Sequence, residues 1–250
     1  MTSSRPSRLL AVDIGNTAVK YALFEDDHLG PVKMQRHMRR EPVVTGTILA
    51  EAAATEPDAI LVCGVVPDLV AALCGRAAKY RILRFREDFP PLVEVGTSVP
   101  AETGDDRVAA ASAAYARTGG AVVIVSAGTA ITVDAVSAEG VFLGGAILPG
   151  PELALKALTT GTAQLPPVSP RSPVSAIGRD TVQAMLAGCL SGTAGAVDRL
   201  IQDIRRELDS DCPVLITGGA AEMLYSALRT ACRKERALVL EGLILSYLSR

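Results

Sequence analysis

A short polar turn near the N-terminus contains the residue types that phosphate binding requires. Residues 13–17 read DIGNT, and Lys20 follows close behind. Gly15 lets the backbone approach a ligand because it has no Cβ, and Lys20 supplies a positive charge of the kind that phosphates attract. The Asp13 carboxylate would repel a phosphate unless a cation lay between them, and Mg²⁺ on a nucleotide meets that requirement. The turn therefore predicts a nucleotide-phosphate site, and an ordinary hairpin turn of Asp, Gly and Asn is the alternative.

An acidic pair lies directly before an Ala-rich helix in the middle of the chain. Asp105 and Asp106 follow Gly104 and precede Arg107, and Val108–Arg117 reads as the helix. The N-terminus of a helix favours anions because its first N–H groups have no partner within the helix. The pattern fits an anion-binding site near Asp106 and Arg107, or a plain N-cap cluster.

The first turn is repeated later in the chain. Val122–Val125 is a predicted strand, residues 126–129 (SAGT) are a turn, and Ala130–Val136 is a second strand. An alignment with one residue missing pairs Gly128 with Gly15, Thr129 with Thr17, Ala130 with Ala18 and Ser126 with Asp13. Two such units suggest two related halves, and ligands in α/β proteins collect in clefts between such halves.

Apolar patterns and turn residues place these motifs on a mixed set of strands and helices. Further strands are predicted at Leu9–Val12, Ala18–Phe24, Ala59–Val65, Arg81–Phe85, Val141–Ile147 and Val214–Thr217. Further helices are predicted at Val43–Ala54, Asp68–Lys79, Thr181–Leu190, Ala194–Leu208, Ala220–Cys232 and Ala237–Leu248. The proline-rich segment Thr162–Gly178 is predicted to be a loop.

The glycine pair Gly119-Gly120 makes a natural joint between two halves. We expect a flexible N-terminus over residues 1–8, an N-terminal α/β half over residues 9–118 and a C-terminal α/β half over residues 119–250. The second half also carries Gly218-Gly219 after a strand, a joint that could receive a flat base or a ribose.

The composition argues against several other classes of protein. The 250 residues carry a net charge of −2, whereas nucleic-acid and membrane-surface binding need a basic field. The most apolar region, Ala121–Val136, is interrupted by polar residues, and a membrane helix needs about 20 predominantly apolar ones. Met1–Arg8 is not a convincing signal or transit peptide, so we expect a soluble, cytoplasmic protein.

Cysteine and histidine usage points away from disulfides and metal centres. The five cysteines form no CxxC pair, which favours reduced thiols. His28 and His37 have no partner at metal-ligand spacing, so a zinc site is not expected. The basic stretch from Lys33 to Arg40, which includes His37, is predicted to be a solvated strand or loop face.

Taken in order, these motifs resemble those of type III pantothenate kinases, members of the actin/Hsp70/sugar-kinase superfamily. The resemblance covers nearly the whole chain and rests on the order and spacing of several short segments. They are Asp13–Lys20 (DIGNTAVK), Gly104–Arg107 (GDDR), Gly128–Ala130 (GTA), Gly144–Gly150 (GGAILPG), Thr162–Pro166 (TAQLP), Gly178–Thr181 and Thr217–Ala220. The resemblance implies an α/β fold of two related ribonuclease-H-like halves with a ligand cleft between them.

The resemblance also implies an activity and a set of site residues. It implies ATP-dependent phosphorylation of pantothenate to 4'-phosphopantothenate, the first step of coenzyme A biosynthesis. Asp106 would be the general base, Arg107 would hold the substrate or the transferring phosphate, and Asp13 would bind Mg²⁺ with ATP. The implied ATP-binding residues are Asp13, Ile14, Gly15, Asn16, Thr17, Ala18, Val19, Lys20, Gly128, Thr129, Gly218 and Gly219. The implied substrate-binding residues are Thr97, Gly104, Asp105, Asp106, Arg107 and Thr181, with Thr181 contributed by the neighbouring subunit of a homodimer.

Two positions depart from the family pattern. Ser126 stands where the family usually has an Asp that binds K⁺ or NH₄⁺, which puts dependence on a monovalent cation in question. Thr97 stands where the family often has a substrate-contacting Tyr, which puts the acceptor in question. The alternative is a family member with altered catalysis, acting as a binding or regulatory protein or on another small hydroxyl substrate. A serine hydrolase built on Ser126 is set aside because Ile124 replaces the first Gly of the GxSxG motif.

Overall fold

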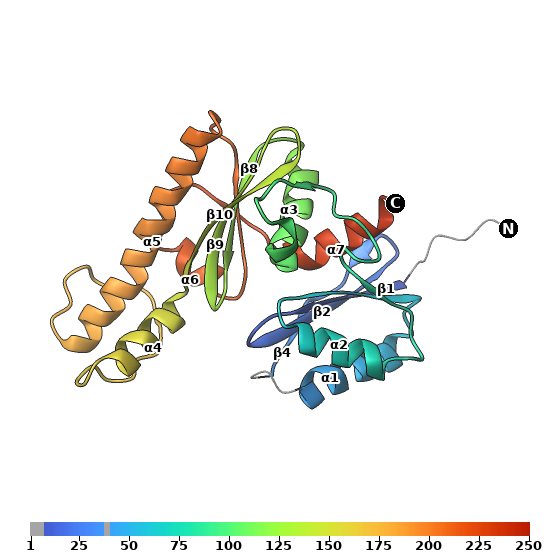
Figure 1. The fold of residues 1–250 in the computed structure, drawn as a ribbon. Coiled ribbons are helices and arrows are strands. Elements are labelled where there is room, and N and C mark those ends of the chain that lie inside the picture. The colour runs from blue at the N-terminus through green and yellow to red at the C-terminus, as the bar shows by residue number, and fades with distance from the viewer. Residues whose placement is uncertain (1–7, 38–40) are drawn as a thin grey trace. The chain divides into compact units, whose positions relative to one another are not determined.

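The computed structural model describes residues 8–37 and 41–250, which form two compact units (Figure 1). The first unit runs to Arg117 and takes up the chain again at Ala237–Arg250, and the second unit is Thr118–Arg236. The predicted flexible N-terminus over residues 1–8 lies outside the described residues except for Arg8, which begins a strand.

The first unit is built on a mixed sheet. Its strands are β1 (Arg8–Ile14), β2 (Ala18–Glu25), β3 (His28–Leu29), β4 (Lys33–Arg36), β5 (Ala59–Gly64) and β6 (Ile82–Arg84). They lie in the order β3-β2-β1-β5-β6, and β4 also pairs with β2. Strand β1 is antiparallel to β2 and parallel to β5, which in turn is parallel to β6. Parallel neighbours need a crossover, and here α1 (Glu41–Thr55) and α2 (Pro67–Arg76) lie in the two crossovers.

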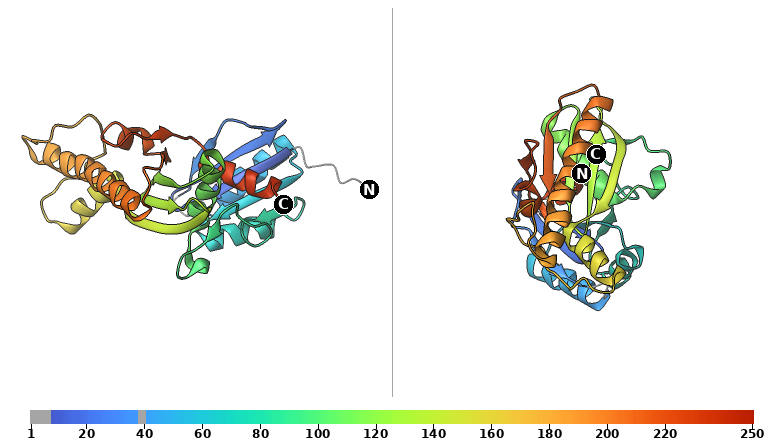
Figure 2. Two further views of the ribbon diagram at one scale, coloured as in Figure 1. Left: turned by 90° about the horizontal axis from the view of Figure 1, so that it is seen from above. Right: turned by 90° about the vertical axis from the view of Figure 1, so that its left-hand side faces the viewer.

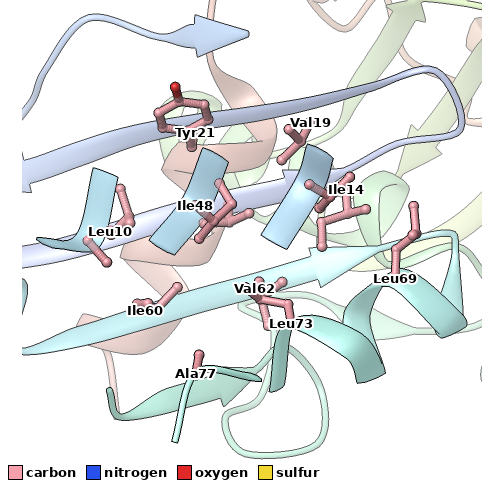
Figure 3. Close-up of a cluster of buried hydrophobic side chains, with 13 residues drawn as sticks. Leu10, Ile14, Val19, Tyr21, Ile48, Ile60, Val62, Leu69, Leu73 and Ala77 are labelled. Carbon is pink, nitrogen blue, oxygen red and sulfur yellow. The ribbon is translucent and has the colours of Figure 1, made fainter. Parts of the chain in front are cut away.

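Strand alternation directs the side chains of β1 to opposite faces of this sheet. Val12 and Ile14 belong to a buried apolar cluster that also contains Ile48 of α1 and Leu73 of α2, and Figure 3 shows Ile14 among these side chains. Asp13 lies between these two residues, so its carboxylate points to the other face. That face is the one against which α7 (Leu238–Leu248) packs, through contacts with β1 and β5.

Helix α7 belongs to the first unit, although the sequence predicted residues 119–250 as one C-terminal half. It packs closely against α3 (Asp105–Thr118), because a Cβ on Gly242 would lie 1.8 Å from the carbonyl oxygen of Ala109. Arg117 of α3 also forms an ion pair with Glu241 of α7. Between β6 and α3 the chain forms the short strand β7 (Glu94–Val95) and the 3₁₀ turn η1 (Pro100–Glu102).

The second unit has its own mixed sheet. Its strands are β8 (Val122–Ala127), β9 (Ala130–Val136), β10 (Val141–Pro149), β11 (Val214–Thr217) and β12 (Arg233–Lys234), in the order β12-β11-β8-β9-β10. Its helices are α4 (Pro151–Gly161), α5 (Thr181–Glu207) and α6 (Ala221–Tyr225). Helix α5 packs on the sheet through Val197 and Ile201, and α4 lies beside it (Figure 2).

Three helix predictions in the second unit need correction. The predicted helices Thr181–Leu190 and Ala194–Leu208 form the single helix α5, because the cost of about 1 kcal/mol for an interior glycine does not outweigh packing on the sheet. The predicted helix Ala220–Cys232 stops at Tyr225. Beyond it, the N–H of Thr230 donates to Oδ1 of Asp198 at 2.9 Å instead of continuing a helical ladder. Helix α4 was not predicted at all.

Other predictions agree with the structure. The α/β class is confirmed, and Thr162–Gly178 contains no helix or strand. All five cysteines are free thiols.

Within residues 8–37 and 41–250, no helix has both the length and the apolar character that crossing a membrane requires.

Candidate active site

The turn between β1 and β2 is closed by backbone hydrogen bonds and clamped by a histidine. The N–H of Gly15 donates to the Ala18 carbonyl oxygen at 3.0 Å, and Asn16 and Thr17 are exposed at the tip. The His37 N–H donates to the carbonyl oxygen of Thr17 at 3.1 Å, and Nε2 of His37 donates to that of Gly15 at 3.0 Å. His37 is buried, with 2% of its surface exposed. The prediction that it belongs to a solvated face is therefore wrong, since its ring packs against the turn.

Asp13 lies at the base of this turn, between side chains from two neighbouring strands. Its cross-strand partners in register are Lys20 of β2 and Cys63 of β5. The Cys63 thiol donates weakly to Oδ1 of Asp13, with the sulfur and oxygen 3.9 Å apart. Burial raises the pKa of Asp13 to about 6, while the charge of Lys20 lowers it and that of Asp106 raises it.

The buried Asp13 carboxylate fits a nucleotide-borne cation. Burial penalises its negative charge, and a divalent cation with phosphate oxygens as its other ligands would offset that penalty. No group of three or more His, Cys, Asp or Glu side chains suited to a metal ion occurs among the residues that the structure describes. Asp13 therefore fits Mg²⁺ that arrives with phosphates better than an ion held by protein ligands alone.

Asp106 lies in the first turn of α3, next to a glycine that leaves room for it. Its Oδ1 accepts a hydrogen bond from the N–H of Arg107 at 2.8 Å. A Cβ on Gly104 would come within 2.8 Å of the same oxygen, so any other residue there would push the carboxylate away. Burial raises the pKa of Asp106, although the backbone N–H and the charge of Arg107 both lower it. A carboxylate with a raised pKa at a helix start is suited to accept a proton.

The first unit brings these separately predicted groups together. Asp106 and Lys20 both act electrostatically on Asp13, and Lys20 also acts on Asp106. The two carboxylates and the ammonium, on β1, α3 and β2, are therefore close enough for their charges to act on the pKa of Asp13 and of Asp106. The sequence alone could not show that Asp106 joins Asp13 and Lys20, because α3 lies far along the chain from β1 and β2.

The turn between β8 and β9 has a similar backbone and different side chains. The N–H of Gly128 donates to the Ala130 carbonyl oxygen at 2.9 Å, and both Gly128 and Thr129 are exposed. Ser126 pairs in register with Thr132 of β9 and with Thr217 of β11. It is partly buried and uncharged, where Asp13 is buried and acidic.

The nearest acid to Ser126 in the sequence is engaged elsewhere. Asp134 is buried and pairs in register with Ile124. Its Oδ2 accepts a hydrogen bond from the hydroxyl of Thr132 at 2.6 Å. This arrangement makes Asp134 part of a polar pair on β9.

The remaining predicted binding residues lie at the ends of elements. Gly218 has φ of +105°, and a Cβ there would lie 2.2 Å from the Ala127 carbonyl oxygen, so this glycine allows β11 to approach β8 closely. Gly219 beside it is exposed. Thr181 is the exposed first residue of α5, whose N-terminus is capped by Asp180. The hydroxyl of Thr97 lies 2.7 Å from that of Thr103, in the segment before α3.

Several residues of the site gave no recognisable signal in the sequence. Cys63 is one of five cysteines for which the sequence predicts only reduced thiols, and His37 belongs to a basic stretch predicted to be a solvated face. Gly64 went unnoticed, although a Cβ there would lie 2.9 Å from both the carbonyl oxygen and the Cβ of Ile14. Each acts through a neighbouring strand, and strand order is not visible in local patterns.

Proteins of known structure define the class to which this fold belongs. A ROK hexokinase from Thermus thermophilus matches 97% of this chain and 99% of its own with a TM-score of 0.52 at 16% identity. The inorganic polyphosphate/ATP-glucomannokinase from Arthrobacter sp. matches 98% of this chain and 100% of its own with a TM-score of 0.51 at 15% identity. Component A of the (R)-2-hydroxyglutaryl-CoA dehydratase from Acidaminococcus fermentans matches 97% of this chain and 97% of its own with a TM-score of 0.59 at 14% identity. The chain therefore has the two-unit α/β fold that sugar kinases share with other proteins.

Sequence similarity narrows this class to one family. Residues 9–203 match the family described as type III pantothenate kinase. The type III pantothenate kinase of Frankia casuarinae is 37% identical over 256 residues, covering 96% of this chain and 98% of its own. That of Roseiflexus sp. is 35% identical over 249 residues, covering 96% and 98%. The chain belongs to the type III pantothenate kinase family.

Proposed function

We propose that this protein transfers the γ-phosphoryl group of ATP to the hydroxyl group of pantothenate, giving 4'-phosphopantothenate and ADP. This is the first step of coenzyme A biosynthesis. The observation that carries the proposal is the convergence of Asp13, Lys20 and Asp106 in the first unit of a member of this family. Phosphoryl transfer needs positioned charges at the phosphates and a base at the attacking hydroxyl.

Asp106 is the base in this proposal. The pantothenate hydroxyl oxygen bonds to the γ-phosphorus, the bond from that phosphorus to the β,γ-bridging oxygen breaks, and the hydroxyl proton passes to the Asp106 carboxylate. Arg107, next in the chain, holds the substrate or the transferring phosphoryl group. Burial raises the pKa of Asp106, which strengthens it as a proton acceptor.

The turn of the first unit binds the phosphates of ATP. Its exposed tip, Asn16 and Thr17, offers side-chain donors, Gly15 allows close approach, and Lys20 supplies positive charge. Asp13 would hold Mg²⁺ directly or through water, and the ion would neutralise charge that develops on the phosphates. In the second unit, Gly128, Thr129, Gly218 and Gly219 would contact ATP.

The substrate side is proposed to involve Thr97, Gly104, Asp105 and Thr181, the last contributed by a second copy in a homodimer. We also place the enzyme in the cytoplasm, where ATP and Mg²⁺ are available. A requirement for K⁺ or NH₄⁺, usual in the family, is not part of the proposal because Ser126 offers no negative charge.

A coupled assay tests the function. Purified protein with Mg²⁺ and ATP should form ADP only when pantothenate is present, and mass spectrometry should detect 4'-phosphopantothenate in equal amount. Pantetheine and simple sugars serve as alternative acceptors. A protein that binds Mg·ATP without turnover on pantothenate would favour the alternative of a family member with altered catalysis, and faster turnover on another acceptor would reassign the substrate.

A further inference from the structure

One arginine ties the end of β6 to the segment that leads into α3. Nη1 of Arg86 donates to the carbonyl oxygen of Thr103 at 2.8 Å and to Oδ1 of Asp105 at 3.1 Å. Nη2 donates to the carbonyl oxygen of Pro100 at 2.7 Å. The guanidinium group therefore spans the whole segment from η1 to the first residue of α3. Its side chain is only 19% exposed, which reduces solvent screening of the pair with Asp105.

These contacts bracket the glycine that makes room for the base. Thr103 and Asp105 lie on either side of Gly104, where a Cβ would lie 2.8 Å from Oδ1 of Asp106. Glycine has the widest conformational freedom of any residue, so Gly104 alone would leave the start of α3 poorly defined. Fixing its two neighbours removes that freedom and fixes where the carboxylate of Asp106 points.

The backbone of Arg86 is itself unusual. Its φ is +66°, in the left-handed region that residues other than glycine and asparagine rarely adopt. The N–H of Arg86 donates to the Phe89 carbonyl oxygen at 2.9 Å, which closes a tight turn. Such a conformation persists where surrounding contacts over-determine it, and it directs the guanidinium toward the α3 segment.

We infer that Arg86 is a positioning residue for phosphoryl transfer, which holds the Pro100–Asp105 segment so that Asp106 is aimed at the acceptor hydroxyl. The inference rests on the proposed role of Asp106 as the base. Arg86 does not act as a proton donor or acceptor in it. Lysine could keep the charge opposite Asp105 but could not span the three acceptors with a planar fork.

The test compares Arg86→Lys with Arg84→Lys. Arg84 is the last residue of β6, two positions before Arg86, and its side chain is 48% exposed and pairs with Glu87. In Arg86→Lys, kcat with pantothenate should fall about 10- to 100-fold, the range expected for a misplaced catalytic group. The KM for ATP should stay unchanged, because the phosphate turn lies on other elements. Arg84→Lys should match the parent in both constants.

Hydrogen exchange provides a second readout that does not depend on turnover. Peptides covering residues 97–108 should exchange faster in Arg86→Lys than in the parent or in Arg84→Lys, whereas the rest of the first unit should not change. An Arg86→Ala variant could fail to fold, so the test relies on Arg86→Lys, which keeps the positive charge.

Two outcomes would overturn the inference. One is unchanged exchange over residues 97–108 in Arg86→Lys, and the other is faster exchange with unchanged kcat. A parent protein without activity on pantothenate would count against the proposed function only, since exchange would still report whether Arg86 holds the segment.

Discussion

In the first unit the strands lie in the order β2-β1-β5-β6, and in the second they lie in the order β9-β8-β11-β12, with matching antiparallel and parallel pairings. The match extends to single hydrogen bonds at the two turns. Gly15 donates to Ala18 as Gly128 donates to Ala130, and the Thr17 and Thr129 carbonyl oxygens accept from His37 and Gly150. The alignment predicted from the sequence, with one residue missing from the second turn, is consistent with these bonds.

The side chains on this shared frame differ in charge. At the end of the first strand, Asp13 is buried opposite Lys20, whereas Ser126 is neutral opposite Thr132. The ring of His37 donates a hydrogen bond to the first turn. The corresponding residue of the second turn is Gly150, where a Cβ would lie 2.3 Å from the carbonyl oxygen of Gly128. The two turns therefore share a backbone frame and differ in the charge of the side chain at the strand end, and under the proposed function that charge decides which turn holds a cation.

Removing the Asp13 side chain should have a much larger effect than the matching change in the second turn. We expect Asp13→Ala to lower kcat/KM for ATP about 100-fold, because the metal and phosphates lose their positioning. Ser126→Ala should change it less than about fivefold, the value of one neutral hydrogen bond. Calorimetric titration with Mg·ATP checks both variants. Equal Mg·ATP affinity in Asp13→Ala and the parent would mean that Asp13 is only a structural residue of the turn and does not hold the metal.

The pH dependence should report the raised pKa of Asp106. A base works only when ionised, so kcat/KM for pantothenate should fall tenfold per pH unit below that pKa. Because burial raises the pKa of Asp106 above its usual range, the loss of activity on acidification should begin at higher pH than for an ordinary Asp. A profile that stays flat down to pH 4, with the protein still folded, would contradict this.

Replacing His37 should change the KM for ATP and not the KM for the acceptor. His37→Leu removes the donor to Gly15 and should raise the KM for ATP about two- to tenfold, the value of one hydrogen bond at the turn. His37→Gln, which retains a donor, should recover part of the loss. His28→Leu is the control because His28 is exposed on β3, and an equal effect at both histidines would remove the special role of His37.

The smallest expected effect concerns monovalent cations. The Ser126 hydroxyl offers only neutral lone pairs, so cation affinity should be low. Replacing Na⁺ by K⁺ at constant ionic strength should activate the parent less than a few-fold, and Ser126→Asp should gain a K⁺ response. A strong K⁺ requirement in the parent would mean that other oxygens complete the site.

Local patterns in the sequence were sufficient for much of the fold and for the turn residues. Leu9–Phe24 and Ala121–Val136 carry apolar runs and polar turns that specify strand–turn–strand units, and both units formed. The first strand of each is two residues longer at its end than predicted, because the pairing of β1 and β8 with their neighbours continues through Ile14 and Ala127. Errors arose where tertiary contacts override local signals. One example is α5, which continues through its interior glycines because it packs on the sheet. Another is α7, which belongs to the first unit although it follows the second unit in the chain.

The parts of the site that the sequence missed depend on neighbours distant in the chain. Arg86 and Asp105 are separated by a loop, and Cys63 reaches Asp13 only because β5 is parallel to β1. His37 resembles a surface residue in its basic surroundings, yet the pairing of β4 with β2 brings it onto the turn. No local pattern contains this information.

The most direct test of phosphoryl transfer with Asp106 as the base is the turnover of Asp106→Asn at saturating ATP and pantothenate. The amide keeps the shape of the carboxylate but cannot take the proton, so kcat should fall by a factor of about 10²–10⁴. Mg·ATP affinity, measured by calorimetry on the same sample, should stay close to that of the parent. An Asp106→Asn protein with near-parental kcat would contradict the assignment of Asp106 as the base.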